Sequence, residues 1–302
     1  MKKIKKIKCL IPFVQLTGYL RGYCYSCCPT WNRAGAIGKI ASGRTLMEIW
    51  NSKRIQTIRQ AVLDDDLKRT CSFEYCPFAM NDKYIDLENF RTSDLLLERI
   101  IEQIREGKTE LSTKPYNYEM AHSGDCNLKC IMCQSNGKYY AVSKALDEYV
   151  YSQLLPGMLP GLSRLTLSGS GDPLFNKYSR SFLQNLNPAR YPYLKINFIT
   201  NGMLFSGNMW HSIKHNNYDS IHVSVDAASQ KTYEYIRKNG HWNTLLKNLE
   251  LISRLRQQGV FNYFEISFIV MHSNYREMKD FAALGLNLGC DKIVFQKIWV
   301  QI

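Results

Sequence analysis

The stretch CNLKCIMC, residues 126–133, places three cysteines within eight residues. A closed zinc site uses four protein ligands, commonly two CxxC-like pairs or a set of cysteines and histidines. No histidine and no fourth cysteine follows in the local loop. A four-iron cluster fits this count better, because three thiolates leave one iron free to bind a ligand from outside the protein.

Short apolar runs alternate with amphipathic helical stretches from about Tyr116 onward, and the longest helical pattern covers residues 232–259. Strands and helices that take turns predict parallel pairing through right-handed crossovers. Six such units indicate an α/β fold with a partial (β/α)6 TIM-like barrel. Cys126 follows the first predicted strand, where loops line the mouth of a parallel barrel. The predicted strands are residues 116–122, 164–169, 195–200, 220–226, 263–271 and 292–298.

The first hundred residues have a different pattern. Residues 13–27 resemble a hairpin that turns near Gly18, residues 44–64 form one amphipathic helical pattern, and residues 92–107 form a second. The chain stops after the sixth predicted strand, so we expect a barrel that could be truncated at that edge. The predicted division is a small cysteine-rich hairpin-plus-helix module (1–80), a linker helix (81–114) and the partial barrel (115–302).

Composition narrows the class of protein. The chain has 302 residues, of which 45% are hydrophobic, and its apolar runs are shorter than the roughly 20 residues that a membrane-spanning helix needs. The basic start has a short apolar part that contains Pro12, so we expect a cytoplasmic protein and no membrane partner. Ten cysteines in tight clusters favour reduced, metal-binding thiols. The net charge of +13 is spread along the chain, which favours a solvated basic surface over nucleic-acid binding.

Five segments occur in an order that resembles the radical S-adenosylmethionine (SAM) enzymes: CNLKCIMC, SGSGDPL, TNG, SVDA and YEYIRKNG. The resemblance implies a 4Fe-4S cluster on Cys126, Cys130 and Cys133, with SAM bound to its fourth iron. It also implies reductive cleavage of SAM to a 5'-deoxyadenosyl radical that abstracts hydrogen from a substrate. The electron would come from a donor such as flavodoxin or ferredoxin.

The same resemblance implies further contacts to SAM, position by position. The segment after the second strand matches the family's Gly-Gly-Glu-Pro motif with an aspartate in place of the glutamate, and its backbone is expected to meet the methionine group. The ends of the third and fourth strands and the YEYIRKNG segment supply the other positions. The implied SAM-binding residues are Ser170, Gly171, Asp172, Pro173, Thr200, Ser224, Asp226 and Arg237.

Six cysteines precede the barrel, in a pattern that resembles the auxiliary-cluster modules named SPASM and twitch. Those modules usually follow the barrel, whereas this one comes first. The resemblance implies a second 4Fe-4S cluster, with Cys24 and Cys28 as substitutes within the ligand set. A closed zinc site built from four of these thiols stays open as an alternative. The expected ligands are Cys9, Cys27, Cys71 and Cys76.

These patterns predict a radical SAM oxidoreductase that acts on a small-molecule or peptide substrate. An auxiliary cluster that takes up an electron favours net two-electron oxidation. A peptide-maturation enzyme is the alternative within the same family, and a zinc-stabilised nucleic-acid-binding protein is the alternative outside it. The sequence assigns no general acid or base, because His122, Glu119, His222, Glu265 and His272 all have ordinary structural explanations.

Overall fold

The computed structural model describes residues 3–40, 43–133, 144–168 and 170–298. Contacts divide the chain into two compact units. Unit 1 comprises residues 1–122 and 143–165, and unit 2 comprises residues 123–142 and 166–302. Strand β8 (Arg164–Leu167) runs across the point where the chain passes from unit 1 to unit 2.

The sheet of unit 1 has the order β6-β2-β3-β4. Strands β6 and β2 are parallel, and the pairs β2–β3 and β3–β4 are antiparallel. The predicted hairpin is confirmed, but its turn lies at Leu20–Gly22 and not near Gly18, which pairs with Cys24 inside the sheet. Gly22 has a φ of 78°, a conformation that glycine adopts without strain. The strands are β2 (Gln15–Tyr19), β3 (Tyr23–Tyr25), β4 (Gly38–Lys39) and β6 (Asn117–Ala121).

The prediction of one helix over residues 44–64 is wrong. Residues 44–64 form two helices, because Asn51 leaves the helical path and its side chain bonds to the backbone of Leu111. The Leu111 N–H donates to Asn51 Oδ1 at 3.0 Å, and Asn51 Nδ2 donates to the Leu111 carbonyl at 2.8 Å. The helices are α1 (Ile11–Val14), α2 (Leu46–Trp50), α3 (Lys53–Leu63), α4 (Pro77–Met80), α5 (Leu95–Arg105), α6 (Lys144–Tyr149) and α7 (Leu155–Met158).

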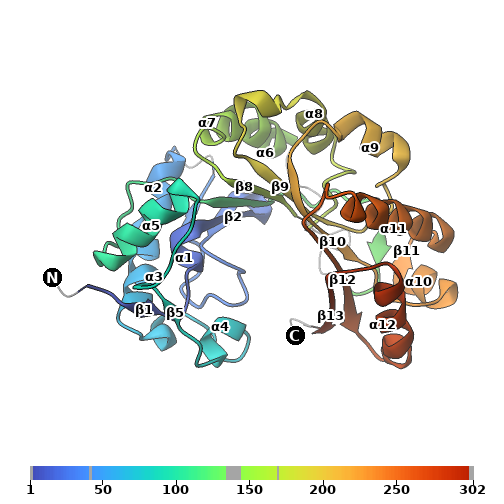
Figure 1. Ribbon diagram of the computed structural model, residues 1–302, viewed down its shortest axis with the longest axis horizontal. Coiled ribbons are helices and arrows are strands. Elements are labelled where there is room, and N and C mark those ends of the chain that lie inside the picture. The colour runs from blue at the N-terminus through green and yellow to red at the C-terminus, as the bar shows by residue number, and fades with distance from the viewer. Residues whose placement is uncertain (1–2, 41–42, 134–143, 169, 299–302) are drawn as a thin grey trace. The chain divides into compact units, whose positions relative to one another are not determined.

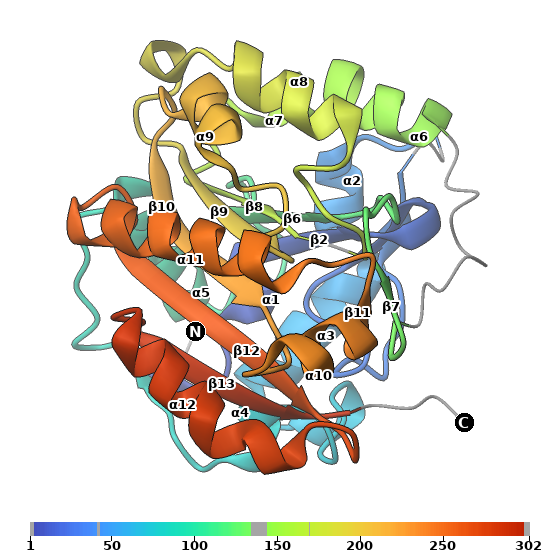
Figure 2. The same cartoon turned by 90° about the vertical axis from the view of Figure 1, so that its right-hand side faces the viewer.

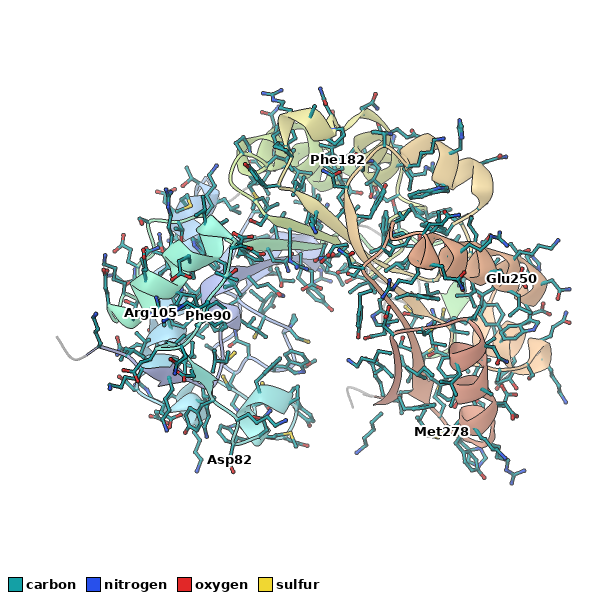
Figure 3. The ribbon with its side chains drawn as sticks, in the orientation of Figure 1. Asp82, Phe90, Arg105, Phe182, Glu250 and Met278 are labelled. Atoms are coloured by element: carbon teal, nitrogen blue, oxygen red, sulfur yellow. The ribbon has the colours of Figure 1, made fainter. Side chains whose placement is uncertain are left out.

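Short elements complete unit 1. Strands β1 (Lys6–Ile7) and β5 (Ile85–Asp86) pair with each other. Arg105, at the end of α5, lies beside Phe90 and donates to its carbonyl at 3.1 Å (Figure 3). The predicted helix at 92–107 is therefore confirmed as α5, and its last residue fastens the segment that follows β5.

Unit 2 contains parallel strands in the order β13-β12-β10-β9, which confirms the parallel pairing expected from the sequence. Helices α10, α11 and α12 lie on one side of β10, β12 and β13 (Figure 1). Every predicted barrel strand is found, within a few residues of its expected ends. The strands are β9 (Lys195–Thr200), β10 (Tyr218–Ser224), β12 (Tyr263–Val270) and β13 (Lys292–Lys297), and the helices are α8 (Lys177–Asn185), α9 (Gly207–Ile213) and α12 (Met278–Asn287).

The helical pattern at 232–259 is interrupted in the structure. Helix α10 (Gln230–Ile236) ends before strand β11 (Arg237–Lys238), and helix α11 (Trp242–Gln257) begins after Gly240. A Cβ on Gly240 would lie 2.7 Å from the Arg237 carbonyl oxygen, so the turn requires glycine. Strand β11 pairs antiparallel with β7 (Lys129–Cys130), as Figure 2 shows. This interruption brings Arg237 to the three-cysteine loop.

None of the helices in the described ranges is both long enough and apolar enough to cross a membrane.

Candidate iron–sulfur sites

The three cysteines of unit 2 lie in one short loop. Cys130 belongs to β7 and pairs in register with Arg237 of β11, while the Cys133 N–H donates to the Cys130 carbonyl at 3.1 Å. Burial raises the pKa of the Cys126 thiol to about 12. Burial also raises the pKa of Cys130, and Arg237 opposes that shift. Bound iron would hold such buried thiols as thiolates.

Three N–H groups point at the sulfurs of this loop. The Leu128 N–H donates to Cys126 Sγ at 3.4 Å, and Asn201 Nδ2 donates to the same sulfur at 3.6 Å. Arg237 Nη1 donates to Cys130 Sγ, also at 3.6 Å. Donors of this kind favour the thiolate form and influence the reduction potential of a cluster on those sulfurs.

The segment after β8 packs directly on the backbone that leads into the loop. A Cβ on Gly171 would lie 2.2 Å from the Asp125 carbonyl oxygen, so only glycine fits there. The Asp172 N–H donates to the same oxygen at 2.7 Å, and Asn176 Nδ2 donates to Ser123 Oγ at 2.9 Å. Ser170 and the buried Pro173 flank this contact, while Gly169 of the quoted motif lies outside the described residues.

The Asp172 side chain is occupied by protein donors. Thr200 Oγ1 and the Asn201 N–H donate to its Oδ2 at 2.7 and 2.9 Å, and the Leu174 N–H donates to its Oδ1 at 2.9 Å. Burial raises the pKa of Asp172, although these donors oppose the shift. The aspartate that replaces the family's glutamate therefore fastens the end of β9 to the segment after β8.

Asp226 and Arg237 form a buried ion pair. Arg237 Nε donates to Asp226 Oδ2 at 2.8 Å, and Nη2 contacts the same oxygen. The Ile269 N–H donates to Asp226 Oδ1 at 2.7 Å, so the carboxylate is held by β12 as well. Burial alone lowers the pKa of Arg237, but Asp226 and Cys130 together raise it above its usual value. Arg237 is thus oriented toward Cys130 by Asp226.

Ser224 ends β10, and His222 lies two residues earlier on the same face of the strand. His222 Nδ1 is 3.4 Å from Glu265 Oε1, its register partner on β12. Lys292 Nζ is 3.4 Å from Glu265 Oε2. Burial lowers the pKa of His222, while Glu265 opposes this shift, so the imidazole favours its neutral form. His222 Nε2 is buried and has no hydrogen-bond partner among the described residues, a feature that the sequence did not reveal.

Two asparagines were missed by sequence reasoning. Asn201 donates to Cys126 Sγ and, at 2.9 Å, to Asn127 Oδ1. Asn176 caps α8 and also reaches the segment before Cys126. Asn201 lies inside the quoted TNG motif, which was the one available signal. For Asn176, the sequence indicated only a residue type that is common at the start of helices.

Four cysteines of unit 1 line one small cavity, here termed the unit 1 cysteine cavity. Its other walls are apolar or neutral, from α1, α3 and the chain around Trp31. Backbone bonds assemble it: the Ser72 N–H donates to the Trp31 carbonyl at 2.8 Å, and Asn32 bridges to Cys71. Burial raises the pKa of the Cys9 thiol to about 12. The cysteines that line the cavity are Cys9, Cys27, Cys71 and Cys76.

The two substitute cysteines are placed elsewhere. Cys24 lies on β3 opposite Gly18, and its buried thiol contacts the Gly22 carbonyl oxygen at 3.9 Å. Cys28 Sγ lies 3.1 Å from Thr30 Oγ1. Neither residue lines the unit 1 cysteine cavity. The geometry therefore favours Cys27 over Cys24 and Cys28 as the ligand from this segment.

Both donor sets suit iron–sulfur clusters. The unit 2 loop offers three thiols with N–H donors around them, and the unit 1 cysteine cavity offers four thiols in apolar surroundings. Within the described ranges, no three histidine, cysteine or acidic side chains gather closely enough to hold a single metal ion. The four thiols of unit 1 are thus spread around their cavity.

Comparison with known families identifies the chain. The model of the radical SAM superfamily matches residues 120–284, which is more than half of the sequence. The chain belongs to the radical SAM superfamily. A second model, for the SPASM iron-sulfur cluster-binding domain, matches residues 9–77. Radical SAM membership implies a 4Fe-4S cluster and SAM as cofactors, and the SPASM domain implies an auxiliary iron–sulfur cluster.

Relatives of this radical SAM chain include enzymes of different kinds. A GTP 3',8-cyclase of Synechocystis sp. is 28% identical over 131 residues, which cover 43% of this chain and 39% of the cyclase. The mycofactocin maturase MftC of Mycolicibacterium smegmatis is 22% identical over 202 residues, which cover 66% of this chain and 47% of the maturase. The chain thus spans less than half of the length of either relative.

Solved structures also resemble the chain. Streptococcus suis SuiB bound to precursor peptide SuiA is 14% identical with a TM-score of 0.47, covering 82% of this chain and 53% of SuiB. Native anSMEcpe with bound AdoMet and Kp18Cys peptide is 17% identical with a TM-score of 0.45, covering 61% of this chain and 51% of anSMEcpe.

These findings confirm the predicted family, the fold class and the types of cofactor. A zinc-stabilised nucleic-acid-binding protein does not account for the two family matches. The individual ligands and SAM contacts stay predictions. They are supported by the geometry of the unit 2 loop and of the unit 1 cysteine cavity.

Proposed function

We propose that this chain is a radical SAM enzyme that oxidises a peptide substrate during its maturation. The observation that carries the proposal is the presence of two separate thiol sets, three in the unit 2 loop and four around the unit 1 cysteine cavity. The maturase MftC matches 66% of this chain and the GTP 3',8-cyclase matches 43%, which favours a role in maturation. A second cluster supplies an electron acceptor, which suits net oxidation.

The unit 2 loop would hold the cluster that binds SAM, through Cys126, Cys130 and Cys133. When bound, this cluster and SAM together supply reductive cleavage and hydrogen abstraction. Gly171 keeps the segment after β8 tight against the loop, because no side chain fits between them. Ser224 and the backbone around Gly171 are the proposed contacts to SAM.

Arg237 would assist this cluster through Cys130. Its guanidinium donates to the sulfur, and Asp226 holds the guanidinium in that orientation. All three guanidinium nitrogens thus have protein partners. A contact from Arg237 to the SAM carboxylate would have to share the N–H groups that remain on Nη1 and Nη2.

Oxidation of a carbon-centred substrate radical releases an electron and a proton, so the enzyme needs a proton acceptor. His222 is the proposed acceptor, because its Nε2 has no hydrogen-bond partner among the described residues and Glu265 lies beside its Nδ1, where it would stabilise the cation that forms. The electron would pass to the cluster held by Cys9, Cys27, Cys71 and Cys76. A flavodoxin- or ferredoxin-like protein would deliver the electron that starts each turnover.

Anaerobic reconstitution tests this proposal. The protein should bind about eight irons per chain and form 5'-deoxyadenosine after chemical reduction. Candidate peptides deuterated at their side chains should transfer deuterium into 5'-deoxyadenosine. Full cleavage of SAM by protein that binds about four irons per chain would contradict only the proposed auxiliary cluster. Absence of any SAM cleavage would contradict the proposed activity as a whole.

A further inference from the structure

Arg59 is a fully buried arginine that has no acidic partner among the described residues. It lies on α3 with none of its surface exposed, and the hydrogen bonds it makes go to carbonyl and amide oxygens. Its Nη2 atom is buried and finds no hydrogen-bond partner within the part of the chain that the structure describes. An uncompensated buried charge costs several kcal/mol as an order of magnitude, so such a residue requires an explanation.

The partners of Arg59 are neutral dipoles and rings. Nε donates to the Pro12 carbonyl at 2.9 Å, and Nη1 donates to Asn51 Oδ1 at 3.0 Å and to the Thr109 carbonyl at 2.7 Å. The guanidinium carbon lies 4.3 Å from the centre of the Trp50 ring. Burial lowers the pKa of Arg59 to about 9, which leaves the side chain charged at neutral pH.

This cation is linked to the unit 1 cysteine cavity through Pro12. Pro12, which accepts the bond from Arg59 Nε, is one of the residues that line the cavity. Ile58 and Val62, on the same helix as Arg59, line it as well. Four thiolates make an iron–sulfur cluster anionic, and reduction adds another negative charge. In low-dielectric surroundings, a nearby cation stabilises that charge strongly.

We infer that Arg59 is the buried counter-charge of the auxiliary cluster, and that it makes this cluster easier to reduce. The inference rests on the proposed cluster in the unit 1 cysteine cavity. It assigns to Arg59 a positioning and electrostatic role rather than a ligand role. Arg59 Nε donates to the Pro12 carbonyl rather than to a thiol, so the effect acts through space.

Redox titration of the full-length chain tests the inference. Replacing Cys126, Cys130 and Cys133 by alanine leaves only the auxiliary cluster to observe by electron paramagnetic resonance. If this background binds no iron, the proposed auxiliary cluster fails before Arg59 is tested. If it binds a cluster, Arg59→Met and Arg59→Gln remove the charge, and Arg59→Lys keeps it.

We expect the midpoint potential to shift to more negative values in both neutral variants and to stay near the parent value in Arg59→Lys. Neutral variants that fold without iron but no longer bind the cluster, while Arg59→Lys binds it, would also support the inference. Equal potentials in all variants would overturn it. Neutral variants that do not fold in the iron-free form would overturn it too, because the arginine would then serve only the packing of α3.

Discussion

The two thiol sets differ in how they are assembled and in how their arginines are paired. In unit 2, three cysteines lie within one loop, polar side chains point at their sulfurs, and Arg237 is neutralised by Asp226. In unit 1, four cysteines from separate segments surround a largely apolar cavity, and Arg59 has no acidic partner among the described residues. The first arrangement suits a cluster with an open iron. The second suits a closed cluster whose negative charge would balance the positive charge of Arg59.

Removing the unit 2 thiols should abolish the SAM-binding cluster and leave the auxiliary cluster in place. The variant in which Cys126, Cys130 and Cys133 are all alanine should lose SAM cleavage, and its iron should fall from about eight to about four per chain. Iron analysis and chromatography of 5'-deoxyadenosine measure both effects. The control is Cys290→Ala in the same unit, which should leave both values unchanged. Residual cleavage in the triple variant would contradict the assignment of this loop.

Substituting single cysteines in unit 1 should show which thiols hold the auxiliary cluster. Cys27→Ala should lower the iron content by about half, because it removes one of four thiols from a closed cluster. Cys28→Ala and Cys24→Ala should retain full iron, since neither thiol lines the unit 1 cysteine cavity. Iron analysis after anaerobic reconstitution decides between them. Iron loss in Cys28→Ala with full iron in Cys27→Ala would reverse the ligand choice.

The unit 2 set could be predicted from sequence because its members are local. The spacing of the three cysteines locates the loop. The motifs that follow the strands locate the Gly171 segment and the end of β10. Neither signal needs tertiary information. The unit 1 set depends on long-range pairing, such as the bridge between Asn32 and Cys71. The resemblance to SPASM modules placed Cys27 ahead of Cys24 and Cys28, but the spacing of the cysteines alone could not decide between them.

The two helix breaks and the burial of Arg59 could not be predicted from the sequence either. Asn51 ends α2 by bonding to Leu111, sixty residues away, and the pair Asn51-Ser52 is only a weak local signal of that break. Arg237 leaves the helical pattern to pair with the cysteine loop. Arg59 fits the pattern of an amphipathic helix with a solvated charge, whereas the structure buries it completely. Each outcome depends on partners that are distant in sequence.

Breaking the Arg237 pair tests whether charge balance differs between the units. Asp226→Asn should lower the free energy of unfolding by about 3–5 kcal/mol, because it leaves Arg237 buried without its carboxylate. Urea unfolding of the iron-free protein measures the loss. Glu88→Gln is the control, since the Lys5–Glu88 pair is exposed, and it should leave stability almost unchanged. Equal effects of the two substitutions would contradict the buried pair's role.

The close packing at Gly171 predicts a smaller loss. Gly171→Ala should cost about 1–3 kcal/mol of stability, because the new Cβ overlaps the Asp125 carbonyl and pushes the segment off the loop. SAM affinity, measured by calorimetry on the reconstituted protein, should fall as well. Gly207→Ala has open space around its Cβ and serves as the control. Unchanged SAM affinity in Gly171→Ala would refute the proposed contact between this segment and SAM.

The smallest expected effect concerns Asn201, which donates to Cys126 Sγ at 3.6 Å, much as Thr70 Oγ1 lies 3.7 Å from Cys71 Sγ in unit 1. Asn201→Ala removes the N–H donor to Cys126 Sγ and should cost about 1 kcal/mol of stability. It should also shift the midpoint potential of the SAM-binding cluster to more negative values, since donors to sulfur stabilise the reduced form. Asn185→Ala, on the exposed face of α8, is the control for stability and potential. A potential that does not move would show that Asn201 only fastens the loop through Asn127.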